Sequence, residues 1–177
     1  MTPQQNFINT EIWILTFGGA FQRASIYAKE INETKRKNFR DALIQFVEVN
    51  LLPKYSKTVH EEEHIENINS IITFSENYKE DILNGSKIRF GVAQKLLNLY
   101  LKYQWCLGNI QMPPHFPVDR IIQVKLKCKP IIPWTTMEND SDYRTIIERA
   151  RGVADEKGVS LAEWELEEFS RRRIIKT

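Results

Sequence analysis

Apolar residues recur at intervals of three and four along most of the chain, which is the spacing of one helix face. In residues 38–52 they are Phe39, Ala42, Leu43 and Phe46, and a similar series runs through 60–83. No stretch alternates apolar and polar residues as a half-buried strand would. The sequence therefore predicts an all-α fold, a compact multi-helix domain that covers residues 1–177.

Glycine and proline divide this pattern into separate helices, because proline blocks helical turns and glycine ends them. The predicted helices cover 7–31 (with a break or a kink at Gly18–Gly19), 38–52, 60–83, 92–107, 142–156 and 161–173. Asp119 precedes the apolar run 120–124 and is placed to cap a short helix. Ser160 and Glu163 form a capping-box pattern before the last helix.

The composition predicts a globular protein without a membrane segment. Of the 177 residues, 42% are hydrophobic and 27% are charged, which is ordinary for a soluble domain. The first residues carry no secretory signal pattern, and the apolar stretches are too short to cross a bilayer. Cys106 and Cys128 are predicted to be free thiols in a reducing compartment. We therefore predict a cytoplasmic monomer that needs no cofactor and has no membrane partner.

Residues 84–95 form a candidate phosphate-binding turn between two helices. Asn84–Gly85 ends the first helix, and the second is predicted to begin near Val92. A helix N-terminus offers unpaired N–H groups and a partial positive charge to an anion. Lys87 and Arg89 add positive charge in the same turn, although the whole chain carries a net charge of only +2. Such a turn suits a DNA backbone without reading any base.

Two motifs in this region resemble those of a known family. Residues 90–95, Phe-Gly-Val-Ala-Gln-Lys, resemble the Pro-Gly-Val-Gly-x-Lys hairpin of the helix-hairpin-helix DNA glycosylases. Residues 116–119, Phe-Pro-Val-Asp, resemble the Val-Pro-Val-Asp of the 8-oxoguanine glycosylase branch. The resemblance covers about 88–124, and the chain has nothing that could supply the sheet domain of larger members. It implies a minimal, all-helical glycosylase whose partner is double-stranded DNA containing a modified base.

The same resemblance assigns roles to residues of the two motifs. It implies that Lys95 is the amine nucleophile and Asp119 the essential carboxylate. It also implies that the hairpin holds the DNA backbone, through the residues Lys87, Arg89, Gly91 and Ala93. Phe90 stands where the family has proline and Ala93 where it has the second glycine. A Cβ at residue 93 narrows the approach of a phosphate.

The chemistry of base removal explains why a lysine and an aspartate would be needed. A carboxylate can stabilise the oxocarbenium-like sugar that forms as the N-glycosidic bond breaks. An amine that attacks C1′ displaces the base and leaves a Schiff base, which requires a lysine whose pKa is lowered by burial or by a helix N-terminus. If Lys95 stays charged, Asp119 could instead activate water, and the strand would not be cut. Activity as an abasic-site lyase therefore stays open.

The target base must leave the DNA stack to reach such a site. The predicted base pocket is drawn from aromatic residues and from polar residues after Gly18–Gly19: Trp13, Phe17, Phe21, Gln22, Arg23, Trp105, His115 and Trp134. The substrate is predicted to be an oxidised purine, the default of this branch. A hypermodified base of bacteriophage DNA, removed in antiviral defence, is the other substrate that the breadth of the family suggests.

Other interpretations of these residues stay open. The chain could be a non-catalytic helix-hairpin-helix module that binds DNA, in which Lys95 is a surface residue and Asp119 only a helix cap. Any single aromatic residue is more often core than pocket. The run His60-Glu-Glu-Glu-His64 matches the zinc protease motif, but its acidic middle favours an exposed helix start. Two cysteines are too few for the four-cysteine iron–sulfur cluster of some glycosylases.

Overall fold

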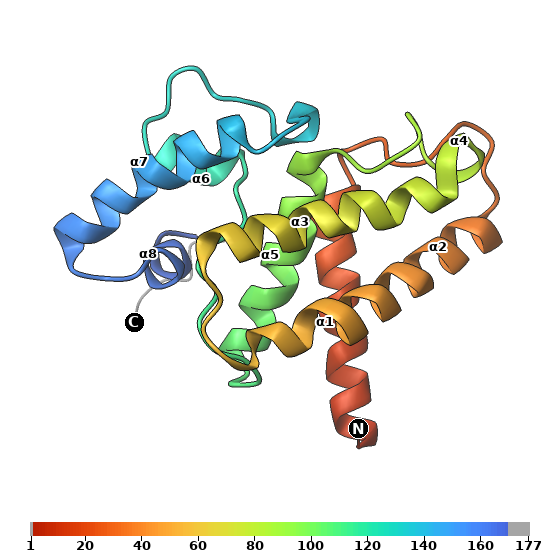
Figure 1. Ribbon diagram of the computed structural model, residues 1–177, viewed down its shortest axis with the longest axis horizontal. Helices are drawn as coiled ribbons and strands as arrows, with labels where there is room; N and C mark the ends of the chain where they lie inside the picture. The colour runs from red at the N-terminus through yellow and green to blue at the C-terminus, as the bar shows by residue number, and fades with distance from the viewer. Residues whose placement is uncertain (1, 170–177) are drawn as a thin grey trace, which may run out of the picture.

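The computed structural model describes residues 2–169, and within them the protein is all-helical, as the sequence predicts. The only β pairing in this range is an isolated antiparallel bridge between Tyr27 and Leu83. Figure 1 shows the arrangement of the helices. Their bounds are α1 Pro3–Phe21, α2 Glu33–Phe46, η1 Val47–Leu51, η2 Leu52–Ser56, α3 Glu61–Ser75, η3 Glu76–Tyr78, α4 Lys79–Ile82, α5 Phe90–Cys106, α6 Arg120–Lys125, η4 Trp134–Thr136, α7 Ser141–Lys157 and α8 Leu161–Glu168.

α1 runs without a break through Gly18–Gly19, so the predicted interruption there is wrong. Its start is defined by a capping box, in which the Thr2 hydroxyl accepts from Gln5 N and the Gln5 side chain accepts from Thr2 N. α1 packs along α5, and such packing outweighs the cost of about 1 kcal/mol for a glycine in a helix. The helix ends at Phe21, earlier than residue 31.

α2 begins at Glu33, five residues before the predicted start. Asn32 caps it by accepting a hydrogen bond from Lys35 N at 2.9 Å. The helix then passes into a single π-helical stretch, η1, and into the 3₁₀ turn η2, which contains Pro53. The predicted end near Leu52 therefore marks a change of helix type, in which η1 carries Glu48 and Val49.

α3 ends at Ser75 and does not reach residue 83 as predicted. The Ser75 hydroxyl accepts a hydrogen bond from Ile88 N at 2.9 Å and donates to Ile72 O, so the turn before α5 is tied to the last turn of α3. Lys79 has a positive φ of 40°, and the single turn α4 follows. Only this one turn stands before residues 84–89, and the predicted helix-hairpin-helix motif is not confirmed.

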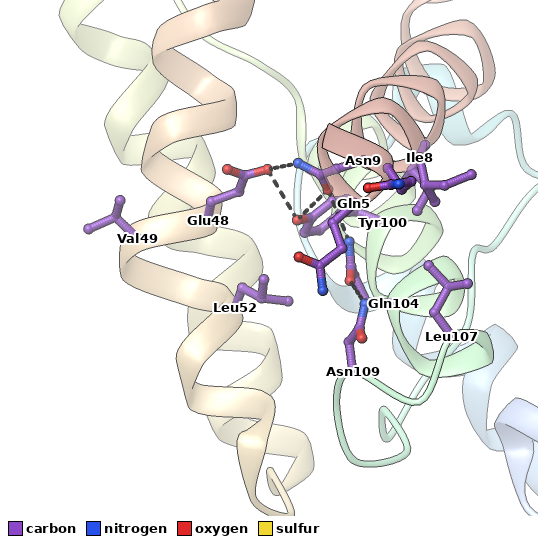
Figure 2. Close-up of a pocket in the computed structure, with 12 residues that line it drawn as sticks. Gln5, Ile8, Asn9, Glu48, Val49, Leu52, Tyr100, Gln104, Leu107 and Asn109 are labelled. Atoms are coloured by element: carbon purple, nitrogen blue, oxygen red, sulfur yellow. Dashed lines mark hydrogen bonds between the residues drawn. The ribbon is translucent and has the colours of Figure 1, made fainter. Parts of the chain in front are cut away.

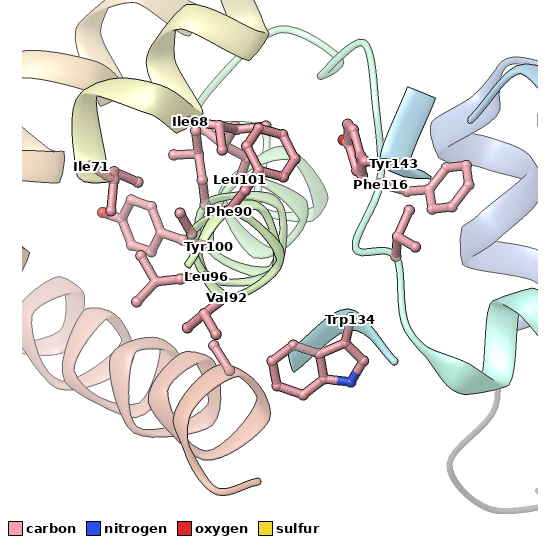
Figure 3. Close-up of a cluster of buried hydrophobic side chains, with 14 of the residues drawn as sticks. Ile68, Ile71, Phe90, Val92, Leu96, Tyr100, Leu101, Phe116, Trp134 and Tyr143 are labelled. Atoms are coloured by element: carbon pink, nitrogen blue, oxygen red, sulfur yellow. The ribbon is translucent and has the colours of Figure 1, made fainter. Parts of the chain in front are cut away.

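α5 is the central helix of the molecule. Its residues 90–101 are all buried, and Figure 3 shows its side chains Leu96 and Tyr100 meeting α1 and α3 while Trp134 and Tyr143 lie on the other side. Burying each large apolar side chain contributes roughly 1.5–3 kcal/mol. Because α5 carries Lys95 and packs against α1, α3 and η4, it supports the candidate site.

The C-terminal helices follow the prediction closely. Gly158 takes the left-handed conformation with φ of 67° and ends α7. Ser160 and Glu163 form the predicted capping box of α8. The residues Arg171–Arg173, and the last part of the helix predicted over 161–173, lie outside the described residues. Within residues 2–169, no helix combines the length and the apolar character that crossing a membrane requires.

Candidate functional site

The structure brings Lys95 and Asp119 together, although 24 residues separate them in the sequence. Lys95 Nζ lies 3.4 Å from Asp119 Oδ2, and their side chains are only 11% and 12% exposed. Lys95 projects from the second turn of α5, while Asp119 stands immediately before α6. A largely buried pair of this kind interacts more strongly than a surface ion pair.

Asp119 caps α6, as predicted, and it also faces Lys95. Its Oδ1 accepts hydrogen bonds from Ile121 N at 2.8 Å and from Ile122 N at 3.1 Å. Its other oxygen, Oδ2, faces the lysine. The two N–H groups and the partial positive charge of the helix start hold the carboxylate in one orientation. The capping role and a chemical role are therefore compatible in this geometry.

Two glutamine side chains hold the extended segments of the site. The Gln94 amide donates to Val118 O at 2.9 Å and accepts from Val118 N at 3.1 Å. The Gln123 amide makes the same pair of bonds with Ile132, each at 2.8 Å. Because Gln94 precedes Lys95 and Val118 precedes Asp119, the first pair sets the lysine opposite the aspartate. No local sequence pattern indicates either contact, and both were missed.

Trp134 lies against the lysine, with Lys95 Nζ 4.2 Å from the centroid of its ring. The ring face attracts a cation, an effect of about 0.5–2 kcal/mol. The backbone around Trp134 packs closely on Gly91: a Cβ on residue 91 would lie 1.8 Å from Trp134 O. Gly91 N also donates to Met137 O at 3.1 Å. Gly91 thus permits the close approach of the 134–137 turn.

This packing corrects the predicted DNA contacts at Gly91 and Ala93. Both residues are buried, the Gly91 N–H is bonded to Met137 O, and Ala93 N donates to Arg89 O. Neither residue presents its backbone to a phosphate. Lys87 and Arg89 are exposed, as a DNA contact requires, but each pairs with a carboxylate: Lys87 with Glu76 at 3.4 Å and Arg89 with Glu138 at 3.0 Å.

The Lys95–Asp119 pair opens into a cleft of about 380 Å³. This volume lies within the range of about 300–1,000 Å³ that is typical of small-molecule sites. Its wall includes the C-terminal half of α1 and the two residues that follow it, Gln22 and Arg23, which the sequence places in the base pocket. The complete lining is Ile14, Leu15, Gly18, Gly19, Gln22, Arg23, Lys95, Leu99, Pro117, Asp119, Ile121, Glu165 and Phe169.

The remaining predicted pocket residues do not line this cleft. Trp13 is buried on another side of α1, where it stacks on Tyr100 with ring centroids 4.2 Å apart. Phe17 packs between Trp13 and Phe21, and Trp105 is also absent from the cleft wall. Trp134 contacts Lys95 without facing the cleft. For Trp13, Phe17, Phe21 and Trp134 the core interpretation describes their place better than the base pocket.

His115, also predicted for the base pocket, belongs instead to a buried polar cluster. Its Nδ1 lies 3.1 Å from Tyr143 Oη, and His64 Nδ1 lies 2.7 Å from Tyr55 Oη. The two imidazole rings meet edge to face, with centroids 5.1 Å apart. Burial lowers the pKa of His115 to about 3 and holds the pKa of His64 well below its usual value. Both rings are therefore neutral structural groups.

The zinc interpretation of His60–His64 finds no support in this arrangement. His60 stands before α3 and is exposed, whereas His64 is buried and bonded to Tyr55. The two side chains thus do not face one ion. Among residues 2–169 no group of three or more histidine, cysteine, aspartate or glutamate side chains is arranged to hold a metal.

Glu165 is a second carboxylate in the cleft that sequence reasoning missed. It is 2% exposed and accepts from Lys102 Nζ at 2.7 and 3.0 Å. Burial raises the pKa of Glu165, the nearby Lys102 opposes that shift, and the negative charge of Asp119 adds to it. In the sequence Glu165 is one of a cluster of glutamates at 163–168, so only the fold distinguishes it from its exposed neighbours.

No protein-family model, no curated protein and no solved structure matches this chain. The function of the protein therefore has to be inferred from its own residues and their geometry.

Proposed function

We propose that the protein is a DNA glycosylase that removes a modified base and leaves an abasic site. The observation that carries the proposal is the Lys95–Asp119 pair, which stands 3.4 Å apart in the wall of a cleft. A cleft and a fixed carboxylate suit the cleavage of an N-glycosidic bond, and an adjacent amine can orient the substrate or attack it. The pairing also joins the two motifs that resemble the glycosylase family.

Asp119 is proposed to act on the sugar and on the attacking water. As the bond between C1′ and the base nitrogen breaks, the base leaves with the bonding electrons and takes a proton from solvent. The carboxylate stabilises the positive charge that develops on the sugar. Water then adds to C1′ and gives a proton to Asp119. The hydrogen bonds from α6 keep the carboxylate oriented throughout.

Lys95 is proposed mainly to bind and orient, with attack on C1′ as a minor path. Its Nζ lies between the Asp119 carboxylate and the face of Trp134. Both the carboxylate and the ring face attract a cation, which suits a role in binding and orientation. Base removal should therefore exceed strand cleavage. An ammonium at this place can also contact the phosphate beside the extruded nucleotide.

DNA contacts are proposed around the mouth of the cleft. Arg23 lines it and Arg120 follows Asp119 in α6; both are exposed, and neither forms an ion pair within residues 2–169. They are better placed to bind phosphate than Lys87 and Arg89, which already pair with carboxylates. Binding through a few such contacts weakens steeply as salt rises. Gln22 is proposed to hydrogen-bond the edge of the extruded base, an oxidised purine or a hypermodified base of phage DNA.

The test is an alkaline-cleavage assay on duplexes with oxidised, deaminated or alkylated bases and on phage DNA with modified cytosines. Asp119→Asn is the informative variant, because asparagine caps a helix as well as aspartate does, so α6 should be kept. We expect the rate of base removal to fall by about 100-fold or more. Asp142→Asn, at an exposed position in α7, is the matched control and should keep full activity.

The outcomes separate the proposal from its rival. Alkali-dependent breaks that Asp119→Asn abolishes support the glycosylase, and breaks that form before alkali add attack by Lys95. Binding to every DNA without any breaks would replace the enzyme with a non-catalytic DNA-binding module. An undiminished rate in Asp119→Asn would remove the central claim.

A further inference from the structure

A second and larger cavity lies between the N-terminal half of α1, the π-helical stretch η1 and the C-terminal half of α5. Its volume is about 770 Å³, and it shares no lining residue with the Lys95–Asp119 cleft. Figure 2 shows Glu48 reaching from η1 toward Asn9 of α1 and Tyr100 of α5. π-helical turns inside helices occur frequently at functional sites.

The polar floor of this cavity is a chain of amides that ends on one carboxylate. Asn109 Nδ2 donates to Gln104 Oε1 at 2.8 Å, and Gln104 Nε2 donates to Asn9 Oδ1 at 3.2 Å. Asn9 Nδ2 in turn donates to Glu48 Oε1 at 2.6 Å. Every donor in the chain points toward Glu48, so the amide dipoles stabilise a negative charge there.

Glu48 Oε1 receives two further hydrogen bonds, from Trp13 Nε1 at 2.8 Å and from Tyr100 Oη at 3.3 Å. The pKa of Tyr100 is raised, mainly by burial and secondly by the negative charge of Glu48. Its hydroxyl therefore stays protonated and can donate. The other oxygen, Oε2, accepts no hydrogen bond from residues 2–169. Three donors thus bond directly to Oε1, and the amides of Gln104 and Asn109 stand behind Asn9. The other oxygen, Oε2, is left toward the cavity.

The charge of Glu48 has no counterpart in the cavity. None of the lining side chains is basic, and Glu48 forms no ion pair within the described part of the chain. Glu48 is half-buried and is stabilised by hydrogen bonds alone, so a cation in the cavity would add a charge-assisted bond at the open oxygen. The same charge repels phosphates and other anions, so this cavity does not suit a DNA backbone.

The rim of the cavity is apolar. Ile8, Val49 and Leu107 line it and are 44%, 64% and 52% exposed. Small-molecule sites typically combine apolar walls with a few polar groups that fix orientation. Here the walls fit an aliphatic stem, and the one uncompensated carboxylate fits a positively charged head that donates hydrogen bonds.

We propose that this cavity binds a small organic cation, with a guanidinium or primary ammonium head on Glu48 Oε2 and an aliphatic stem between Ile8, Val49 and Leu107. The volume accommodates a whole small molecule, which favours a free amine over a single side chain of a protein partner. This site is independent of the glycosylase proposal, since it uses none of the same residues.

Isothermal titration at pH 7 with agmatine, 1,5-diaminopentane and hexylamine tests the site, with hexanoate as the probe of reversed charge. We expect at least one of the cations to bind and hexanoate not to bind. Glu48→Gln keeps the size and the acceptor oxygen but removes the charge, and should weaken cation binding at least tenfold. Glu11→Gln, at an exposed position of α1, is the matched control and should bind as the wild type does.

Val49→Trp gives a second test, because this exposed side chain can be enlarged without disturbing the core and should block the cavity. The Val49→Trp variant tests the cation site even if the Glu48→Gln variant does not fold. Equal cation affinity in Glu48→Gln or Val49→Trp, binding of hexanoate, or no binding of any cation would overturn the site. A tripeptide with a central arginine and blocked ends represents the side chain of a protein partner and is titrated last. Tighter binding of this peptide than of agmatine would overturn the assignment to a free small molecule.

Discussion

Replacing Gly91 with alanine should destabilise the protein, although glycine is a poor helix former. The new Cβ would lie 1.8 Å from Trp134 O and 2.8 Å from Trp134 C, about 1.6 Å short of an ordinary contact with that oxygen. The obstacle is backbone, so a rotamer change cannot relieve it. Displacing the 134–137 turn also breaks the bond from Gly91 N to Met137 O.

The magnitude follows from three terms. Overpacking a core costs about 1–3 kcal/mol, and the lost hydrogen bond costs about 1 kcal/mol more. The gain in helix propensity returns about 1 kcal/mol. We expect a net loss of about 1–3 kcal/mol in the free energy of unfolding, measured by urea denaturation. Because Trp134 moves away from Lys95, its indole fluorescence should change as well.

Gly152→Ala is the matched control. Gly152 is also a helical glycine, in α7, but a Cβ added there meets nothing within 4 Å. This variant should gain about 0.5–1 kcal/mol. The two substitutions are therefore predicted to have opposite signs. A Gly91→Ala protein as stable as the wild type would refute the packing role of this glycine. The predicted contact of Gly91 with the DNA backbone would then have to be considered again.

Two more predictions concern the buried polar groups. The pKa values of His64 and His115 are lowered in the folded protein, so the unfolded chain gains protons first as the pH falls below about 6.5. Stability should drop from there toward pH 3, and His115 alone should account for about 2 kcal/mol of the loss at pH 5. Urea denaturation from pH 7 to pH 5 measures this, and a His115→Gln protein with an undiminished pH dependence would contradict it. Gln94→Leu removes both bonds to Val118 and leaves its backbone groups buried and unpaired, at a cost of roughly 2–4 kcal/mol. Its thermal unfolding midpoint and base-removal rate should both fall, whereas Gln45→Leu at an exposed position of α2 should change neither.

Much of the helical fold could be predicted because it depends on local patterns. The period of three and four predicts α5, α7 and the first part of α8, and the capping residues Asp119 and Ser160 are where the sequence indicates. The errors arise where distant contacts prevail. Gly18–Gly19 does not break α1 because α5 supports it, and α3 ends at Ser75 because that hydroxyl binds Ile88 N.

The candidate site was predictable only in part. Lys95 and Asp119 were found through a resemblance, and the structure brings them together. Glu165 and Gln94 could not be found, since each acts through residues more than 20 positions away. Trp13 and His115 were assigned to the pocket on residue type alone, and residue type does not indicate which side of a helix faces a cleft.

The paired amides of Gln94 and Gln123 have a consequence for how this protein can evolve. Each glutamine binds both the N–H and the carbonyl of one residue in an extended segment, as a neighbouring strand would in a sheet. These hydrogen bonds involve only backbone atoms of Val118 and Ile132. They therefore do not depend on which side chain stands at those two positions. Variation should be opposed at the two glutamines, whereas at Val118 it is limited by burial in the core and not by these hydrogen bonds. The position of Asp119 beside Lys95 therefore depends on the Gln94 amide, which no substitution at Val118 can replace.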